Sequence, residues 1–399
     1  MDPVIGLDVA KGESQVQAFL QKKNPYKKSF KFEHNALGLC DFYRFYQEVE
    51  DVSGLPPVVI FKSTGHYHEP VLQFLEEHQI TYFLINPVLS YESRKSSLRK
   101  VKTDAIDAFR LGELYYQNED LEAFQKKSIR TMNLRHLTRQ YESLTGMYVQ
   151  AKLQFQTILD QVFPEYKKVF AALYSPTSLS TLRYYQTPEG VKKETVDQMA
   201  EVILRQGAKR SLKWALEKAQ KLKDAAERDP FNHNVYSSNL VCLNLTIQLL
   251  LQYQEHLSQV KKEIDALAEE FEEYRIIRSI PGIGGKIAAT IIAEIGEIDP
   301  FSHPKKLVAY AGIDPSIFES GKFKATINKI TKRGSSRLRH VLYTAAQCGI
   351  TNNRNPKLKA FYDKKREEGK PHKVAIIACA NKLIHWIYAL LKRKEAFKI

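Results

Sequence analysis

Two aspartates near residue 105 are spaced so that they can act together on one metal ion. Asp104 and Asp107 lie three residues apart in a stretch of helical character, and this spacing aims both carboxylates at one side of a helix. A third acid, Asp8, closes a short apolar segment at residues 4–8 that has the pattern of a strand. Because Mg²⁺ prefers carboxylate oxygens, these three acids outline a metal-dependent phosphoryl-transfer site.

The elements that would position these acids alternate between strands and helices. Strand patterns occur at residues 4–9, 14–20 and 29–32. A helix pattern follows at 36–49, and further strand patterns occur at 58–61 and 81–85. A turn is expected at 22–25. Three hairpin-linked strands followed by alternating helices and strands predict an α/β domain with an RNase H-like fold over residues 1–125. In that fold, acids gather where the first and fourth strands approach each other.

Residues 126–272 are predicted to form a long helical coiled-coil region. Apolar residues alternate spacings of three and four from 134 to 162 and from 243 to 271, and each run lasts about four heptads. The two runs can pair antiparallel within one chain or across a dimer. An insertion at about 165–235 separates them, and a mostly α C-terminal domain is expected at 273–399.

The C-terminal region carries signals for nucleic-acid binding. A glycine-rich turn at 279–284 precedes a helical run and resembles a helix-hairpin-helix motif, whose backbone N–H groups can bind a phosphate. Between Ser320 and Tyr362 the chain has many cations and no Asp or Glu, which favours a phosphate-binding face. The predicted nucleic-acid-binding residues are Lys100, Lys102, Gly282, Gly284, Lys286, Lys322, Lys324, Lys329, Lys332, Arg333, Arg337 and Arg339.

Charge and cysteine content indicate the kind of partner and the compartment. The 399-residue chain has a net charge of +15, which favours a polyanion such as nucleic acid over the alternative of a merely basic soluble protein. Its four cysteines form no CxxC pair, as expected in a reducing cytoplasm. We expect no secretory signal and no membrane partner, because polar residues interrupt the apolar stretch at 374–391, which reads as a buried helix.

Seven motifs in a fixed order resemble those of the DEDD transposases of bacterial insertion sequences. They are IGLDVAK around Asp8, STG at 63–65, NP at 86–87, KTDAIDA at 102–108, IPGIG at 280–284, AYAGI at 309–313 and FESG at 318–321. The resemblance spans nearly the whole chain except the insertion. It implies a RuvC-like N-terminal domain, a C-terminal transposase domain and a bacterial cytoplasmic enzyme that recombines donor and target DNA.

The resemblance also implies roles for particular residues. Asp8, Asp104 and Asp107 would hold Mg²⁺ together with the residue at position 62, and Ser320 matches a serine that attacks a phosphodiester to form a phosphoserine link. A serine hydroxyl is a weak nucleophile and needs activation. The implied partners are donor and target DNA, a structured non-coding guide RNA, and further copies of the chain in a dimer or tetramer.

Position 62 departs from the family pattern. Where the family has Glu, this chain has Lys62, which cannot ligate Mg²⁺ while protonated. At about 4 Å and an effective dielectric near 20, each unit charge contributes roughly 4 kcal/mol, so the exchange weakens metal binding strongly. We predict that Lys62 pairs with one of the three aspartates, and that the chain keeps its architecture and its nucleic-acid binding but is catalytically impaired, whether the lysine is natural or introduced.

Two other classes of function remain open at this level. A hydrolytic nuclease such as a junction resolvase would use the RuvC-like domain alone, with metal-activated water. A catalytically dead nucleic-acid-binding protein would bind tightly and in a salt-sensitive way, and would give no product even with Glu at position 62.

Overall fold

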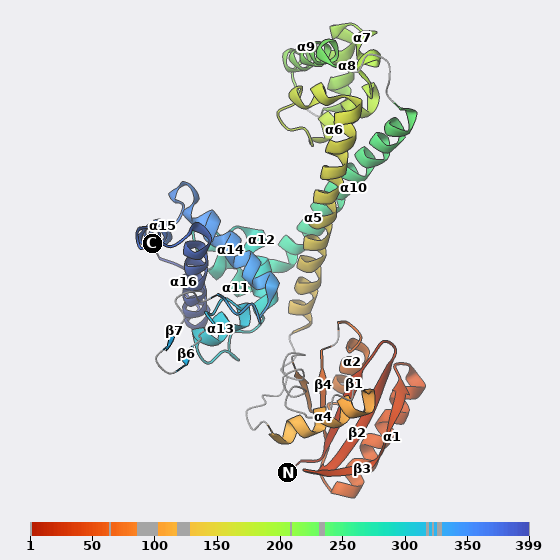
Figure 1. The fold of residues 1–399 in the computed structure, drawn as a ribbon, viewed down its shortest axis with the longest axis vertical. Coiled ribbons are helices and arrows are strands. Elements are labelled where there is room, and N and C mark those ends of the chain that lie inside the picture. Colours follow the sequence, from red (N-terminus) through yellow and green to blue (C-terminus); the bar gives the residue numbers. More distant parts are fainter. Residues whose placement is uncertain are drawn as a thin grey trace. The chain divides into compact units, whose positions relative to one another are not determined.

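The computed structural model describes residues 2–63, 65–85, 103–117, 128–207, 210–230, 236–316, 319–320, 323–324 and 329–398. For 319–320 and 323–324 it describes the backbone. The chain divides into two compact units, Met1–Lys126 and Lys127–Ile399 (Figure 1). Of the residues predicted to act, Lys100, Lys102 and Lys322 lie outside the described residues, as do the side chains of Ser320 and Lys324.

The first unit is built on a five-stranded mixed sheet. Its strands are β1 (Val4–Val9), β2 (Glu13–Gln21), β3 (Asn24–Glu33), β4 (Val58–Lys62) and β5 (Tyr82–Ile85). Their order is β3-β2-β1-β4-β5. The β1–β2 and β2–β3 pairs are antiparallel, whereas the β1–β4 and β4–β5 pairs are parallel. The predicted succession of three hairpin-linked strands and two later strands is confirmed, and with it the α/β class of this unit.

Helices cover both faces of the sheet because β1 is apolar on both. The helices of this unit are α1 (Ala36–Ser53), α2 (Glu69–Glu77) and α4 (Asp104–Gln117). α1 and α2 pack on the face that carries Ile5 and Leu7, and α4 packs on the face that carries Val4. A Cβ atom at Gly6 would lie 2.2 Å from the Ala108 carbonyl oxygen. Glycine at this position therefore lets α4 lie directly against β1.

The turn between β2 and β3 is shorter than predicted. A turn over 22–25 was expected, but Pro25 already pairs with Phe19 inside the sheet. Proline lacks an N–H donor, and it is tolerated here because β3 is an edge strand. Lys23, with φ of 64°, reverses the chain instead.

The second unit is mainly helical. Its elements before the C-terminal part are α5 (Ile129–Val162), η1 (Pro164–Lys168), α6 (Pro176–Tyr185), α7 (Pro188–Lys192), α8 (Val196–Gln206), α9 (Leu212–Arg228) and α10 (Ser237–Ala268). The C-terminal part contains α11 (Glu272–Arg278), α12 (Gly285–Ile295), α13 (Pro304–Ala311), β6 (Glu319–Ser320), β7 (Phe323–Lys324), α14 (Ser336–Ile350), η2 (Thr351–Asn353), α15 (Pro356–Glu367) and α16 (His372–Arg393).

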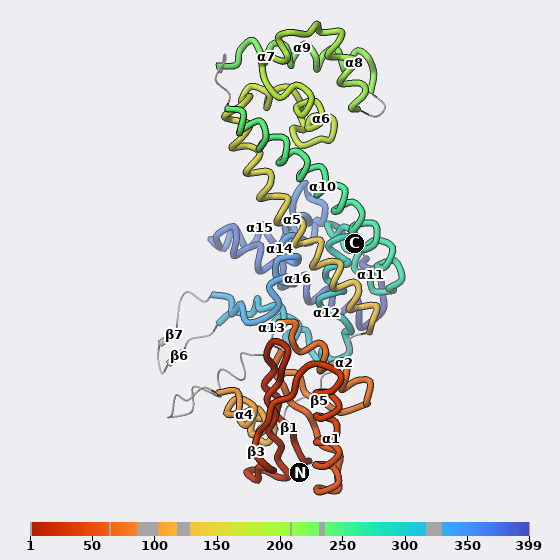
Figure 2. Tube along the Cα trace, turned by 90° about the vertical axis from the view of Figure 1, so that its right-hand side faces the viewer, coloured from red at the N-terminus to blue at the C-terminus, as the bar shows by residue number. Residues whose placement is uncertain are grey.

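The two longest helices, α5 and α10, lie side by side in both views (Figures 1 and 2). Gln254 donates to the Tyr148 hydroxyl at 2.8 Å, and Asn239 donates to Gln161 at 3.2 Å. Since the partner number falls as the residue number rises, the two helices are antiparallel. They pair within one chain, which is one of the two arrangements that the sequence left open.

Two hydrophobic cores lie at opposite ends of this helix pair. One joins α5 and α10 to the helices of the insertion and contains Phe155 and Tyr166. The other joins the opposite ends of α5 and α10, at Leu134 and Ile264, to the C-terminal helices. The insertion therefore shares a core with one end of the helix pair, separate from the C-terminal core.

Among the described residues, α16 is long and apolar enough to cross a membrane by length and composition alone. Its buried residues recur on one face, at Ile376, Ala380, Leu383 and Ile387, and belong to the C-terminal core. The apolar stretch at 374–391 is thus a core helix in this structure, as predicted.

Candidate active site

Strand geometry brings Asp8 and Lys62 to one place. Side chains alternate between the two faces of a strand, so Asp8 faces α4 as Val4 does, and Lys62 follows Ile60 on that same face. β1 and β4 are parallel, with Leu7 paired to Phe61. Asp8 and Lys62, which follow this pair, are therefore neighbours at the carboxyl ends of the two strands.

Lys62 forms an ion pair with two of the three predicted acids. Its Nζ lies 2.6 Å from Asp8 Oδ1 and 3.7 Å from Asp107 Oδ2. The side chains of Lys62, Asp8 and Asp107 are only 15%, 9% and 4% exposed. Asp107 reaches this position from the first turn of α4. The predicted pairing of Lys62 with the acids is present, and it is partly screened from water.

Asp104 faces another lysine. Its carboxylate lies 3.6 Å from Lys31 Nζ on β3 and is 55% exposed. Within the described ranges, no three His, Cys, Asp or Glu side chains form a group that could hold a metal ion. An ammonium between Asp8 and Asp107 occupies the place that a divalent ion would need, so the residues present do not fit Mg²⁺.

Burial shifts the titration of Asp8. Loss of solvent raises the pKa of the Asp8 carboxyl above its ordinary value, the Lys62 ammonium opposes this rise, and the charges of Asp107 and Asp104 add to it. Asp104 is thus close enough to act on Asp8 electrostatically although its own ion pair is with Lys31.

Ser320 lies in a small hairpin whose stem is well anchored. β6, which ends at Ser320, pairs antiparallel with β7. Below it, the Thr331 hydroxyl donates to Asp314 Oδ1 at 2.6 Å, and the Thr331 N–H donates to the Asp314 carbonyl at 2.9 Å. Ser316 donates both its N–H and its hydroxyl to the Lys329 carbonyl. These bonds fix where the hairpin leaves the helical core.

The two glycines predicted to bind phosphate differ in their surroundings. Gly282 has φ of 97°, and a Cβ atom there would lie 2.5 Å from the Cα atom of Gly349 on α14. A Cβ at Gly284, the N-cap of α12, would meet nothing within 4 Å. Gly282 therefore lets the turn pack against α14, whereas Gly284 is open to a ligand.

The predicted basic residues also divide into two groups. Arg339 donates to the Ala311 carbonyl at 3.2 Å, and Arg337 pairs with Glu142 at 2.7 Å. Lys332 and Arg333 lie exposed in the loop before α14, and Lys329 lies exposed in the hairpin stem. Both arginines thus contact the protein itself, and Lys329, Lys332 and Arg333 are exposed to solvent.

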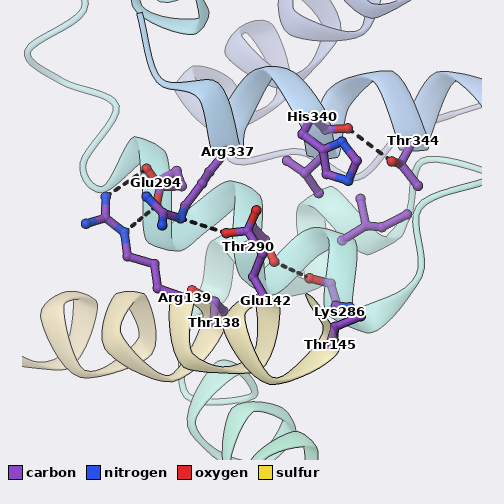
Figure 3. A pocket seen from close by; sticks show the side chains of 12 residues that line it. Thr138, Arg139, Glu142, Thr145, Lys286, Thr290, Glu294, Arg337, His340 and Thr344 are labelled. Atoms are coloured by element: carbon purple, nitrogen blue, oxygen red, sulfur yellow. Dashed lines mark hydrogen bonds and ion pairs between the residues drawn. The ribbon is translucent and has the colours of Figure 1, made fainter. Parts of the chain in front are cut away.

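Sequence reasoning missed a buried carboxylate that joins three helices. Glu294 on α12 is 1% exposed, and it accepts bonds from Arg139 at 2.9 Å and from Ser335 at 3.1 Å. Arg135 lies 3.6 Å from the same carboxylate. Figure 3 shows Glu294 at one end of a groove between α5, α12 and α14. A signal was available, since Glu294 is the one acid in the otherwise apolar second half of α12.

The pKa of Glu294 reflects this network. Burial alone would raise it, but the bond from Arg139, the charges of Arg135 and Arg139, and the Ser335 hydroxyl together hold the pKa below its ordinary value. Glu294 therefore stays ionised inside the fold and holds α5 and α14 to α12.

Comparison with known proteins gives the class of the chain. A family model of the DEDD type from IS110 elements, described as a transposase, matches residues 5–164, which include Asp8, Lys62, Asp104 and Asp107. A second model, described as a transposase of the IS116/IS110/IS902 family, matches residues 274–363, which include Ser320. Both models describe transposases. The chain belongs to the IS110 family of insertion-element transposases.

Several relatives show the extent of the similarity. The chain is 25% identical over 298 residues to an uncharacterised 44.8 kDa protein of insertion element IS116 from Streptomyces clavuligerus, covering 74% of this chain and 72% of the relative. It is 31% identical over 157 residues to the transposase of IS1111A from Coxiella burnetii, covering 39% and 43%. It is 29% identical over 139 residues to a pilin gene-inverting protein from Moraxella bovis, covering 35% and 43%.

Proposed function

We propose that this chain is a DNA transposase or recombinase of a bacterial insertion sequence whose chemistry is blocked by Lys62. The observation that carries the proposal is the ion pair of Lys62 with Asp8 and Asp107 at the carboxyl ends of β1 and β4. Membership of the IS110 family supplies the reaction class. The relatives named for transposition and for gene inversion support DNA strand exchange as the activity.

The proposal includes the fold of the first unit and the coiled-coil character of the second. The strand order β3-β2-β1-β4-β5, with its antiparallel half and its parallel half, supports an RNase H-like, RuvC-like first unit. The antiparallel pairing of α5 and α10 supports a coiled-coil segment next to a C-terminal transposase domain. In this proposal β1 and α4 supply the acids, β4 supplies Lys62, and β6 supplies the serine.

Ser320 is the proposed nucleophile. Its Oγ attacks the phosphorus of a DNA phosphodiester and forms a phosphoserine bond, while one bridging P–O bond breaks and its oxygen leaves as a strand-end hydroxyl with the proton that the serine gave up. A hydroxyl of another strand then attacks the same phosphorus and releases the serine. The number of phosphodiester bonds is unchanged, so no nucleotide cofactor is needed.

The acid cluster as it stands does not accommodate Mg²⁺, because the Lys62 ammonium lies between Asp8 and Asp107. With Glu at position 62, carboxylates from β1, β4 and α4 would meet at Asp8, position 62 and Asp107, and such a set suits a hard divalent ion. Lys62 replaces that ion by an ammonium, which preserves the fold of the first unit without the chemistry.

The proposed partners are donor and target DNA, a structured guide RNA, and further copies of the chain in a dimer or tetramer, all in the bacterial cytoplasm. The net charge of +15 and the exposed Lys329, Lys332 and Arg333 support nucleic-acid binding. On duplex DNA, each neutralised phosphate contributes about −0.9 to the slope of log affinity against log salt. Steeply salt-dependent binding is therefore expected whether or not strand exchange occurs.

The test is strand exchange with cognate DNA, guide RNA and Mg²⁺, comparing this chain with Lys62→Glu and probing for a covalent protein–DNA adduct. Exchange and an adduct in Lys62→Glu alone would support the proposal. Equal activity in both would mean that position 62 does not govern the site.

A second pair of variants separates the alternatives. In the Lys62→Glu background, Ser320→Ala should abolish both the adduct and strand exchange. Cleavage that survives Ser320→Ala would instead indicate a hydrolytic nuclease. Salt-sensitive binding with no product from Lys62→Glu would indicate a nucleic-acid-binding protein without catalysis.

A further inference from the structure

A groove in the second unit combines cations, hydroxyl groups and apolar surface. It encloses about 200 Å³ between α5, α12 and α14. In Figure 3, Lys286, Arg337 and His340 surround it together with side chains that include Glu142 and Thr290. All of these residues lie within the second unit, so the groove does not depend on where the first unit lies.

Lys286 is the cation of this groove that is available to an anionic ligand. Arg139 is committed to Glu294 at 2.9 Å, and Arg337 is committed to Glu142 at 2.7 Å. Lys286 forms no ion pair with any carboxylate in the described part of the chain, and its Nζ lies 3.9 Å from the centre of the Tyr141 ring. Glu142 acts on Lys286 electrostatically without forming an ion pair with it. A cation without an ion pair, in a groove lined by two more cations, attracts an anion.

The Arg337–Glu142 pair places a carboxylate where an anionic ligand would lie. It joins α14 to α5 along the side of the groove (Figure 3). The two side chains are 43% and 50% exposed, so the pair adds only about 0–1 kcal/mol to stability. A phosphate offers more charge and more acceptor oxygens than one carboxylate. It can therefore replace Glu142 at the Arg337 guanidinium, which the pair already holds in position.

The remaining wall suits a sugar or a base. Four threonines line it, and each donates its hydroxyl to a carbonyl of its own helix: Thr138, Thr145, Thr290 and Thr344. Their methyl groups and oxygen lone pairs therefore remain available to a ligand. Ile287 and Val341 add apolar surface. Such a wall packs against a ring, and its oxygens can accept N–H or O–H groups.

We propose that this groove binds one nucleotide, with the phosphate at Lys286 and Arg337 and the sugar or base against the threonines. The inference rests on the proposed function only for the source of the nucleotide, which is a residue of an RNA or DNA strand in preference to a free nucleoside phosphate. Glu142 holds the phosphate position in the unbound state.

The test compares three ligands on the full chain by NMR or calorimetric titration at low salt: a nucleoside 5′-monophosphate, the matching nucleoside and inorganic phosphate. The monophosphate should bind at least about tenfold more tightly than either part, because hydrogen bonds to charged groups contribute about 1.5–3 kcal/mol each. Lys286→Gln and Arg337→Gln should each weaken its binding by about tenfold. Equal affinity for all three ligands, or no effect of either variant, would overturn the inference.

Glu142→Gln gives the sharper test because its effect has the opposite sign. Removing this carboxylate frees Arg337, so monophosphate binding should tighten by about three- to fivefold. Glu255→Gln, an exposed carboxylate of α10, is the matched control and should have no such effect. Tighter binding in both variants to the same extent would show a general charge effect and contradict a specific site.

A short single-stranded oligonucleotide identifies the source. Binding that depends on Lys286 as the monophosphate does would assign the groove to a strand; dependence seen only with the monophosphate would assign it to a free nucleotide. Strand exchange by the Lys62→Glu variant is a separate readout. Its failure with nucleotide binding intact would count against the proposed function and not against the groove.

Discussion

The ammonium of Lys62 lies 2.6 Å from Asp8 and 3.7 Å from Asp107, between the two acids that are most buried at this edge of the sheet. The placement follows from strand register, because Leu7 and Phe61 are paired and the next residues face the same helix. One positive charge offsets part of the charge of two carboxylates in a site with little water.

Lys62→Met should destabilise the first unit by about 3 kcal/mol at neutral pH, since it leaves two buried carboxylates without a counter-charge. The folded-state pKa of Asp8 lies above its ordinary value. Protonation of Asp8 therefore stabilises the folded state fully below the unfolded pKa, and this stabilisation is lost as pH rises through the folded pKa. The loss of stability in Lys62→Met should become smaller as pH falls through the range between these two pKa values. Denaturant unfolding at several pH values measures this, with the exposed Lys31→Met as control; a deficit that does not depend on pH would contradict it.

Lys62→Glu should make the stability of the first unit depend on Mg²⁺. The added carboxylate repels Asp8 and Asp107, so the variant should unfold at a lower temperature than the parent without divalent ions. A ligand at one hundred times its Kd stabilises by about 2.7 kcal/mol. Thermal unfolding with and without Mg²⁺ is the measurement, and the parent chain is the control. A parent that responds as strongly as the variant would refute this account of position 62.

Gly282→Ala and Gly284→Ala should differ although the residues are two apart. The first change combines φ of 97° with a contact 2.5 Å from Gly349, and it should cost about 2–4 kcal/mol. The second meets open space, and as an N-cap change it should cost less than about 1 kcal/mol. Equilibrium unfolding of both variants checks this. Similar losses would show that the turn does not pack on α14 as described.

Glu294→Gln should destabilise the second unit by about 2 kcal/mol at neutral pH, because Arg135 and Arg139 lose a shared partner in a partly buried site. The folded-state pKa of Glu294 is lowered. Its contribution is therefore present above the unfolded pKa and disappears as pH falls through the folded pKa. Unfolding followed from pH 7 into the acid range should show the two proteins converging, while Glu255→Gln stays close to the parent throughout.

Asp314→Ala should loosen the stem below Ser320 by about 1 kcal/mol, the typical net value of one hydrogen bond. Hydrogen exchange at the Thr331 amide should become faster. In the Lys62→Glu background, strand exchange should fall more than DNA binding does, because the change affects the position of the serine. Unchanged exchange with a loosened stem would show that the hairpin does not need this anchor.

The sheet and the Lys62 pairing could be predicted because they depend on local rules. Alternation along the strand at 4–9 determines which face Asp8 occupies, and short strands in succession leave few topologies. The direction of Asp104 could not be predicted from spacing alone. Both acids lie on the same side of α4, but Gly6 determines how closely α4 lies on β1, and the first residue of the helix then meets Lys31.

The roles of the C-terminal residues were harder to predict because they depend on contacts between distant segments. The glycine-rich turn was recognised, but nothing near Gly282 indicates its contact with Gly349, sixty-seven residues later. The groove was missed because its walls come from three helices. Charge counting identified Lys286 and Arg337, yet it could not show that Glu142 holds one of them and leaves the other without an ion pair.

The lysine at the end of β4 is a counter-ion fixed to the backbone. It does not diffuse away, because covalent bonds to the backbone hold it beside the two aspartates. For the same reason a chelator cannot remove it, and calcium or manganese cannot take its place by exchange. A chelating buffer should therefore leave the N-terminal fold of this chain intact. The covalent cation that protects the fold in this way also keeps soluble ions out, so raising their concentration should not restore the reaction.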